Sequence, residues 1–191
     1  LIVSDPMSIY YLSDVYIEPG ERMLALLIKP DAVKLYVNAL FPVEQQDGLE
    51  ICVLNDGFEP TIQLSQDVSG IVGVDKNWPS RFLLALMERA SIKPVVGSPA
   101  VDICRMHKDA WEMEEMRKAS AGNDRVMERT IRQLREGMTE RELAAIMTKI
   151  YDEEGMPRVA FDPLICFGEN GAFPHHETGD SKLKPGDSVI I

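Results

Sequence analysis

The sequence changes its pattern near residue 105, and this change constrains the fold more than any other feature. Before it, short apolar and β-branched runs are separated by Pro, Gly and Asp, which is typical of strands and turns. From Asp109 the chain is rich in Glu, Met, Arg and Lys, with apolar residues three or four positions apart, which predicts helices. The chain is therefore expected to form two domains, residues 1–105 and 106–191, with the boundary in the region from Arg105 to Lys108.

The first domain is predicted to be an α/β layer domain. Its first forty residues alternate strand-like runs with turns, which predicts a β-meander, and residues 79–90 have the apolar spacing of a helix. Ser4 or Asp5, followed by Pro6, suits the N-cap and first turn of a short helix, and Asp5 is interpreted as a cap. The predicted strands cover residues 1–3, 9–12, 23–28, 33–38, 51–54 and 71–74.

Two helices are predicted to open the second domain. The first is stopped by Gly137, and the second begins at Thr139 with a capping box that includes Glu142. The Arg and Glu residues of both helices are interpreted as solvated faces. The first helix is expected to bury the methionine-rich stripe Met113, Met116, Ala119 or Ser120, Asn123, Met127, Ile131 and Leu134. The second is expected to bury Leu143, Ile146, Met147 and Ile150.

A histidine-bearing loop follows, between strands predicted at residues 164–167 and 189–191. Its Gly, Asn and Pro residues predict a tight turn that presents His175 from a strand end. Adjacent residues of an extended segment point to opposite sides, so His175 and His176 can hardly serve one site. The residues alone do not decide between the two. His107, at the domain boundary, is interpreted as a surface or hinge residue.

The segment FDPLICFGENGAFPHHETGDSKLKPGDSVII, residues 161–191, resembles the pita-bread metallopeptidases, and most closely the Xaa-Pro dipeptidases (prolidases) and aminopeptidases P. Further segments match in the order of the family: VSDPMSIYYLS at 3–13, PGER at 19–22, RMHKDAWEMEEMRKA at 105–119 and GMTEREL at 137–143. The resemblance implies a creatinase/prolidase-like N-terminal domain followed by the start of an α+β pita-bread catalytic domain.

The resemblance also implies roles for the two loop histidines. The active-site histidine of the family lies five residues after the Asn of the N-G-A-x-P-H motif, which is His175 when counted from Asn170. His175 would then be a catalytic and substrate-binding residue that donates to the tetrahedral intermediate, and it would not be a metal ligand. His176 would be a rim residue or a hydrogen bond to the fold.

Two divalent metal ions, Mn, Co or Zn, are implied as cofactors that activate a water molecule. The segments that supply the family's metal ligands have no counterpart in residues 1–191. We therefore expect the chain to be part of a longer polypeptide, to bind no metal by itself and to be inactive alone.

The implied function is that of an Xaa-Pro metallopeptidase, a homodimeric hydrolase acting on proline-containing peptides. A metal-independent creatinase-type amidinohydrolase and a non-catalytic homologue serving as a binding module remain alternatives. The net charge of −11 argues against nucleic acid as a partner. No apolar run approaches the ~20 residues of a membrane span, and three widely spaced cysteines favour the reducing cytoplasm.

Overall fold

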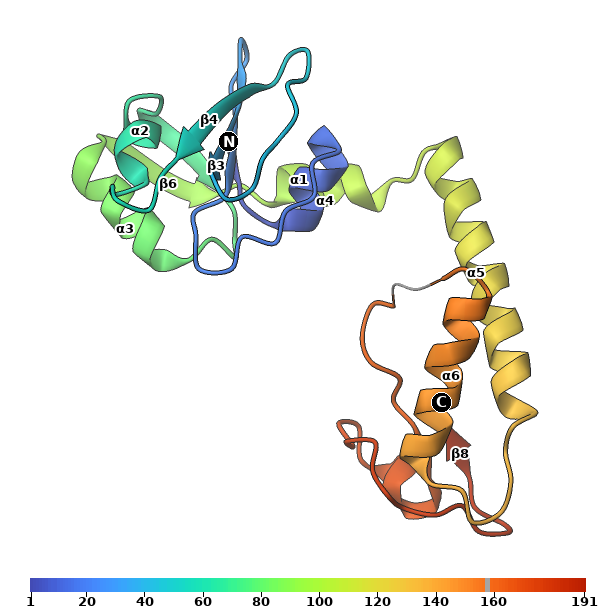
Figure 1. Ribbon diagram of the computed structural model, residues 1–191. Helices are drawn as coiled ribbons and strands as arrows, with labels where there is room; N and C mark the ends of the chain where they lie inside the picture. The colour runs from blue at the N-terminus through green and yellow to red at the C-terminus, as the bar shows by residue number, and fades with distance from the viewer. Residues whose placement is uncertain (157–158) are drawn as a thin grey trace. The chain divides into compact units, whose positions relative to one another are not determined.

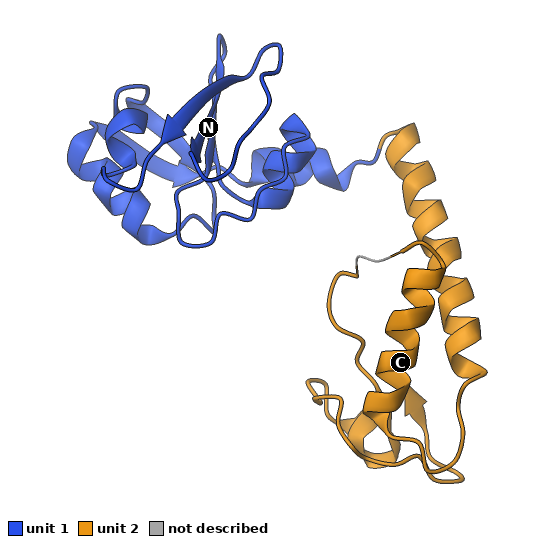
Figure 2. Ribbon diagram, in the orientation of Figure 1, with its two compact units in different colours: residues 1–108 blue, residues 109–191 orange. Residues whose placement is uncertain are grey.

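The chain folds into two compact units, Leu1–Lys108 and Asp109–Ile191 (Figure 2). The structure, a computed structural model, describes residues 1–156 and 159–191. The division between the units falls at the end of the region in which the sequence changes its pattern. Each unit has its own buried core and is described separately below.

Unit 1 is built on a six-stranded mixed sheet with the strand order β4-β3-β2-β1-β5-β6 (Figure 1). The pairs β1–β2 and β2–β3 are antiparallel, whereas β3–β4, β1–β5 and β5–β6 are parallel. The strands are β1 (Ile2–Val3), β2 (Ala25–Ile28), β3 (Val33–Asn38), β4 (Glu50–Leu54), β5 (Gly70–Val74) and β6 (Ile92–Val96).

Helices cover both faces of this sheet. On one face, Leu64 and Leu86 from two helices pack into one core cluster, and on the other face Ile9 and Val101 pack into a second. Successive residues of β2 alternate between the two clusters, as the pleat of a strand requires. The helices are α1 (Pro6–Ser13), α2 (Thr61–Ser65), α3 (Ser80–Arg89) and α4 (Pro99–Met106). The predicted α/β class is confirmed.

The predicted β-meander is wrong at residues 9–12, which belong to helix α1. The side chain of Asp5 accepts a hydrogen bond from the Ser8 amide at 2.8 Å, and Pro6 occupies the first turn. The N-cap predicted for Asp5 is therefore confirmed, and this cap overrides the β-propensity of the residues after it. Strand β6, which contains Pro94, is not among the predicted strands. Proline is tolerated there because β6 is at the edge of the sheet.

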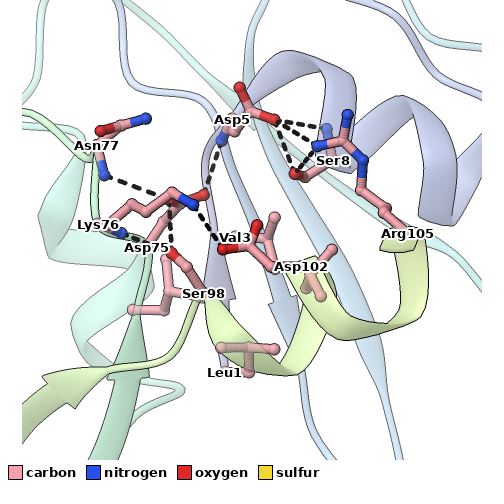
Figure 3. Close-up of a pocket in the computed structure, with 12 residues that line it drawn as sticks. Leu1, Val3, Asp5, Ser8, Asp75, Lys76, Asn77, Ser98, Asp102 and Arg105 are labelled. Atoms are coloured by element: carbon pink, nitrogen blue, oxygen red, sulfur yellow. Dashed lines mark hydrogen bonds and ion pairs between the residues drawn. The ribbon is translucent and has the colours of Figure 1, made fainter. Parts of the chain in front are cut away.

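A buried carboxylate ties together the carboxyl ends of the parallel strands in unit 1. Asp75 follows β5, and its side chain accepts hydrogen bonds from the backbone amides of Ser4 and Asp5, each at 3.0 Å. It also accepts from the Asn77 amide at 3.3 Å and from the Ser98 hydroxyl at 3.0 Å (Figure 3). Burial alone would raise the pKa of Asp75, but these donors outweigh it and lower the pKa below its usual value.

Unit 2 consists of two packed helices and a small two-stranded sheet (Figure 1). The helices are α5 (Ala110–Ile131) and α6 (Glu140–Glu153), and the antiparallel strands are β7 (Cys166–Phe167) and β8 (Val189–Ile190). Both helices start with a capping box, so the one predicted at Thr139 is confirmed. Of the helices in the described part of the chain, none has the length and apolar character needed to cross a membrane.

The predicted buried face is correct for α6 and wrong for most of α5, where Asn123 and Ile131 are exposed in addition to the first two methionines. In α6, Leu143, Met147 and Ile150 are buried. In α5, by contrast, Met113 and Met116 are 41% and 54% exposed. The buried positions of α5 are Gly122, Val126 and Thr130. The second half of α5 packs against the rest of unit 2. There, Arg125 and Arg129 form ion pairs with Glu154 at the end of α6.

We predict that Asp75→Ala lowers the free energy of unfolding of unit 1 by roughly 2–4 kcal/mol, because buried backbone amides lose their acceptor. Urea unfolding followed by Trp78 fluorescence in a Trp111→Phe background measures this. Asp47→Ala, in an exposed loop of the same unit, is the control. An equal effect of the two alanine substitutions would contradict the role given to Asp75.

Candidate functional site

His175 lies on the surface of unit 2, in the loop between β7 and β8. The loop begins with a 3₁₀ helix, Gly168–Ala172, and the exposed His175 follows it by three residues. Among the described residues, no hydrogen bond or ion pair to the His175 ring is found. The ring is thus available to a ligand, and its catalytic role remains a prediction.

His176 is directed into the unit instead. Its Nε2 lies 2.8 Å from Oε2 of Glu140, and its side chain is 18% exposed. Of the two roles predicted for His176, the structure shows the hydrogen bond to the fold. The two adjacent histidines therefore have different surroundings.

Glu140 is fully buried and is the shared acceptor of the loop. Its Oε1 accepts from the Phe167 amide at 2.9 Å and from Asn170 Nδ2 at 2.7 Å. Its Oε2 accepts from the Gly179 amide at 3.0 Å, in addition to the His176 ring. One carboxylate thus connects strand β7, the 3₁₀ helix, His176 and Gly179.

The charge on Glu140 is stabilised by these donors. Burial alone would raise the pKa of a carboxyl group, but the hydrogen bonds from Asn170, His176 and the two backbone amides outweigh it and lower the pKa to about 2. Burial and the nearby charge of Glu140 together raise the pKa of the Cys166 thiol. Cys166 therefore remains a protonated, buried thiol and is not an activated nucleophile.

The start of the loop is fixed by a turn just before β8. Gly168 has φ +56, in the left-handed region, and a Cβ atom there would lie 2.9 Å from Oδ1 of Asp187. The Gly168 amide donates to the Ser188 carbonyl at 2.9 Å, and Asp187 accepts from the Lys184 amide at 2.9 Å. This close approach requires glycine at position 168.

The interpretation of the helix carboxylates as a solvated face is wrong for Glu140. Its position contained a signal, because residues 140, 143, 147 and 150 follow the spacing of one helix face. The last three of these positions are the buried apolar residues of α6. A glutamate in register with them is expected on the core side, where it needs hydrogen-bond donors.

The described residues do not offer a metal site. Among them, no group of three or more His, Cys, Asp or Glu side chains could hold an ion. The pair of Glu140 and His176 also fits a metal poorly, because each carboxylate oxygen already accepts two hydrogen bonds.

Unit 1 contains a separate hollow of about 230 Å³ beside the carboxyl end of β1 (Figure 3). Charged side chains line it, but they pair with one another. Lys76 binds Asp102, and Arg105 binds Asp5 and the Ser8 hydroxyl. The first pair holds α4 to the segment after β5, and the second holds α4 to α1. These contacts serve the fold of unit 1, and we assign no ligand to the hollow.

Two families of known proteins match the chain. Residues 1–107 match the creatinase/prolidase N-terminal domain, and residues 114–191 match metallopeptidase family M24. The probable dipeptidase PepE of Mycobacterium tuberculosis is 30% identical over 100% of this chain and 53% of its own length. An uncharacterized peptidase of Staphylococcus aureus is 26% identical over 99% of this chain and 55% of its own length.

Solved structures agree with these matches. The dipeptidase of Pyrococcus horikoshii has a TM-score of 0.85 at 26% identity, and the match covers 98% of this chain and 55% of that one. The prolidase of Thermococcus sibiricus has a TM-score of 0.85 at 27% identity, covering 98% and 54%. The chain thus spans about half the length of the relatives it matches.

We predict that unit 2 becomes acid-sensitive through Glu140. The folded-state pKa of about 2 lies below the ordinary 4.5, so the carboxylate stabilises the fold fully above pH 4.5 and loses this effect as the pH falls towards 2. The contribution is on the order of 3 kcal/mol. Amide hydrogen exchange of peptides covering residues 161–179, corrected for intrinsic rates, measures it between pH 6 and 2.5.

Glu140→Gln should remove most of this pH dependence. Glu142→Gln is the matched control in the same helical turn, because glutamine also completes a capping box. The same acid response in Glu140→Gln and the unsubstituted chain would contradict the assignment.

Proposed function

This chain belongs to the M24 metallopeptidases that carry a creatinase/prolidase N-terminal domain, and from this we propose that the whole protein is an Xaa-Pro metallopeptidase that hydrolyses the bond between a residue and a following proline. The observation that carries the proposal is the likeness of both units, over 98% of the chain, to a prolidase structure. The dipeptidases among the relatives named above support the peptidase class.

We propose that His175 is the residue of this chain that acts on the substrate, as a hydrogen-bond donor. Peptide hydrolysis places negative charge on the carbonyl oxygen, and a hydrogen-bond donor already aimed at that oxygen stabilises the transition state. The exposed ring of His175, on a loop held by the buried Glu140, suits such a donor. His176 cannot serve in the same way while its ring is bound to Glu140.

The metal of the proposed enzyme needs other ligands. Since the described residues bring no suitable cluster together, none of their side chains is assigned a ligand role. We propose that the whole protein binds two divalent ions, Mn, Co or Zn, through residues outside 1–191.

The proposed setting is a homodimer in the cytoplasm that acts on proline-containing peptides. The three cysteines support a reducing compartment, since all are free thiols, with Cys52 and Cys166 buried and Cys104 exposed. The amidinohydrolase and binding-module alternatives gain no support from the relatives named above, which are dipeptidases, a prolidase and an uncharacterized peptidase.

We predict that His175→Ala in the whole protein lowers kcat for an Xaa-Pro dipeptide about 10²–10³-fold, the usual cost of losing one transition-state donor. Metal content per chain should stay unchanged. His176→Ala should have a milder effect, and His107→Ala, which changes an exposed histidine at the end of α4, is the control. Loss of the metals from His175→Ala, or full activity, would overturn the donor role.

Calorimetric titration of residues 1–191 with Mn²⁺ tests where the metal ligands lie. We expect no submicromolar site, because hard divalent cations need several oxygen ligands that converge on one point. A submicromolar Mn²⁺ site in this segment would contradict the proposal that the metal ligands lie outside residues 1–191.

A further inference from the structure

We propose that Glu140 is a positioning residue, whose buried carboxylate fixes the direction in which the loop presents His175. This inference rests on the proposed function, because it gives Glu140 a purpose only if His175 meets the substrate. Glu140 itself is fully buried and so does not touch the substrate.

The first argument is the spread of the donors along the loop. The four groups bound to Glu140 come from residues 167, 170, 176 and 179, so they enclose His175 on both sides in the sequence. A carboxylate that served only to satisfy one buried amide would not need donors from the whole loop. Here a single rigid group determines the path of the entire segment.

The second argument is that Glu140 is itself held firmly. It is the first residue of α6, directly after the N-cap Thr139 and within the capping box, and the core residue Leu143 lies one turn further along. The outgoing end of the loop also accepts bonds from this helix start. The Glu140 amide donates to the Ser181 carbonyl at 3.1 Å, and the amide of the next residue donates to the Gly179 carbonyl at 2.9 Å.

The third argument concerns the two histidines. Their peptide planes are joined, so the direction of one side chain restricts the direction of the other. The His176 ring is directed towards Glu140, and the His176 amide donates to the Phe173 carbonyl at 3.1 Å, which closes a turn around His175. His175 is thereby left on the exposed side of the loop without any bond of its own among the described residues.

A purely structural role would give a different result from a positioning role. Glu140→Gln keeps the size of the side chain but replaces one acceptor oxygen with an NH₂ donor, which faces two donors of the loop. If Glu140 only stabilises the fold, the folded fraction of this variant should keep normal kinetics. If Glu140 positions His175, the folded enzyme should lose kcat, because small displacements of a reacting group reduce rates strongly.

The experiment measures kcat, KM, metal content and thermal unfolding of the whole protein with an Xaa-Pro dipeptide. For Glu140→Gln we expect a loss in kcat of about 10–10²-fold, the order that a displacement near 1 Å produces. KM and metal content should change little. Glu142→Gln is the control. In a His175→Ala background, Glu140→Gln should cause no further loss, because residues that act as one unit are not additive.

A second comparison covers the case in which Glu140→Gln does not fold. His176→Gln retains an N–H donor near the position of the ring Nε2, so it should keep a higher kcat than His176→Ala. Equal kcat values for these two variants would overturn the positioning role.

The outcomes separate the two proposals. If His175→Ala leaves kcat unchanged, the proposed role of His175 fails, whatever Glu140 does. If His175→Ala lowers kcat but Glu140→Gln does not, or if the two losses multiply in the double variant, His175 keeps its role and the positioning inference fails.

Discussion

The structure of unit 2 depends on one buried negative charge. An ionised carboxylate without water is stable only when several donors converge on it, and Glu140 meets four of them. Three of these donors, from residues 170, 176 and 179, come from a loop segment without buried apolar side chains, and the fourth comes from the core strand β7. The cost of burying the charge therefore selects one arrangement of a polar, glycine-rich loop, which hydrophobic packing alone would leave undetermined.

Unit 1 uses the same principle at a different place. Asp75 accepts hydrogen bonds from backbone amides that follow β1 and β5 and from the Ser98 hydroxyl that follows β6. In both units a carboxylate at the start or end of a regular element organises the irregular segments around it. The hydrophobic clusters define where helices and sheet lie, and the carboxylates define the paths of the connections between them.

The helix caps could be predicted from the sequence because they depend on local signals. The caps at Asp5 and Thr139 depend on contacts within a few residues, and both are present in the structure. The exposure of Met113 and Met116 and the burial of Glu140 depend on what packs against each helix. Such partners are distant in the sequence, so a local pattern can rank possible faces but cannot select the one that is covered.

The pair of histidines shows how this arrangement could serve catalysis. A donor for a developing oxyanion must be fixed in direction and still lack a strong partner before the substrate arrives. A single histidine cannot easily meet both demands, because any bond that orients its ring also occupies it. In this loop the orienting bond belongs to His176, and the exposed ring of His175 stays free of hydrogen bonds from the described residues. The division between a bound and an unbound histidine is thus a physical consequence of placing one buried carboxylate beneath the loop.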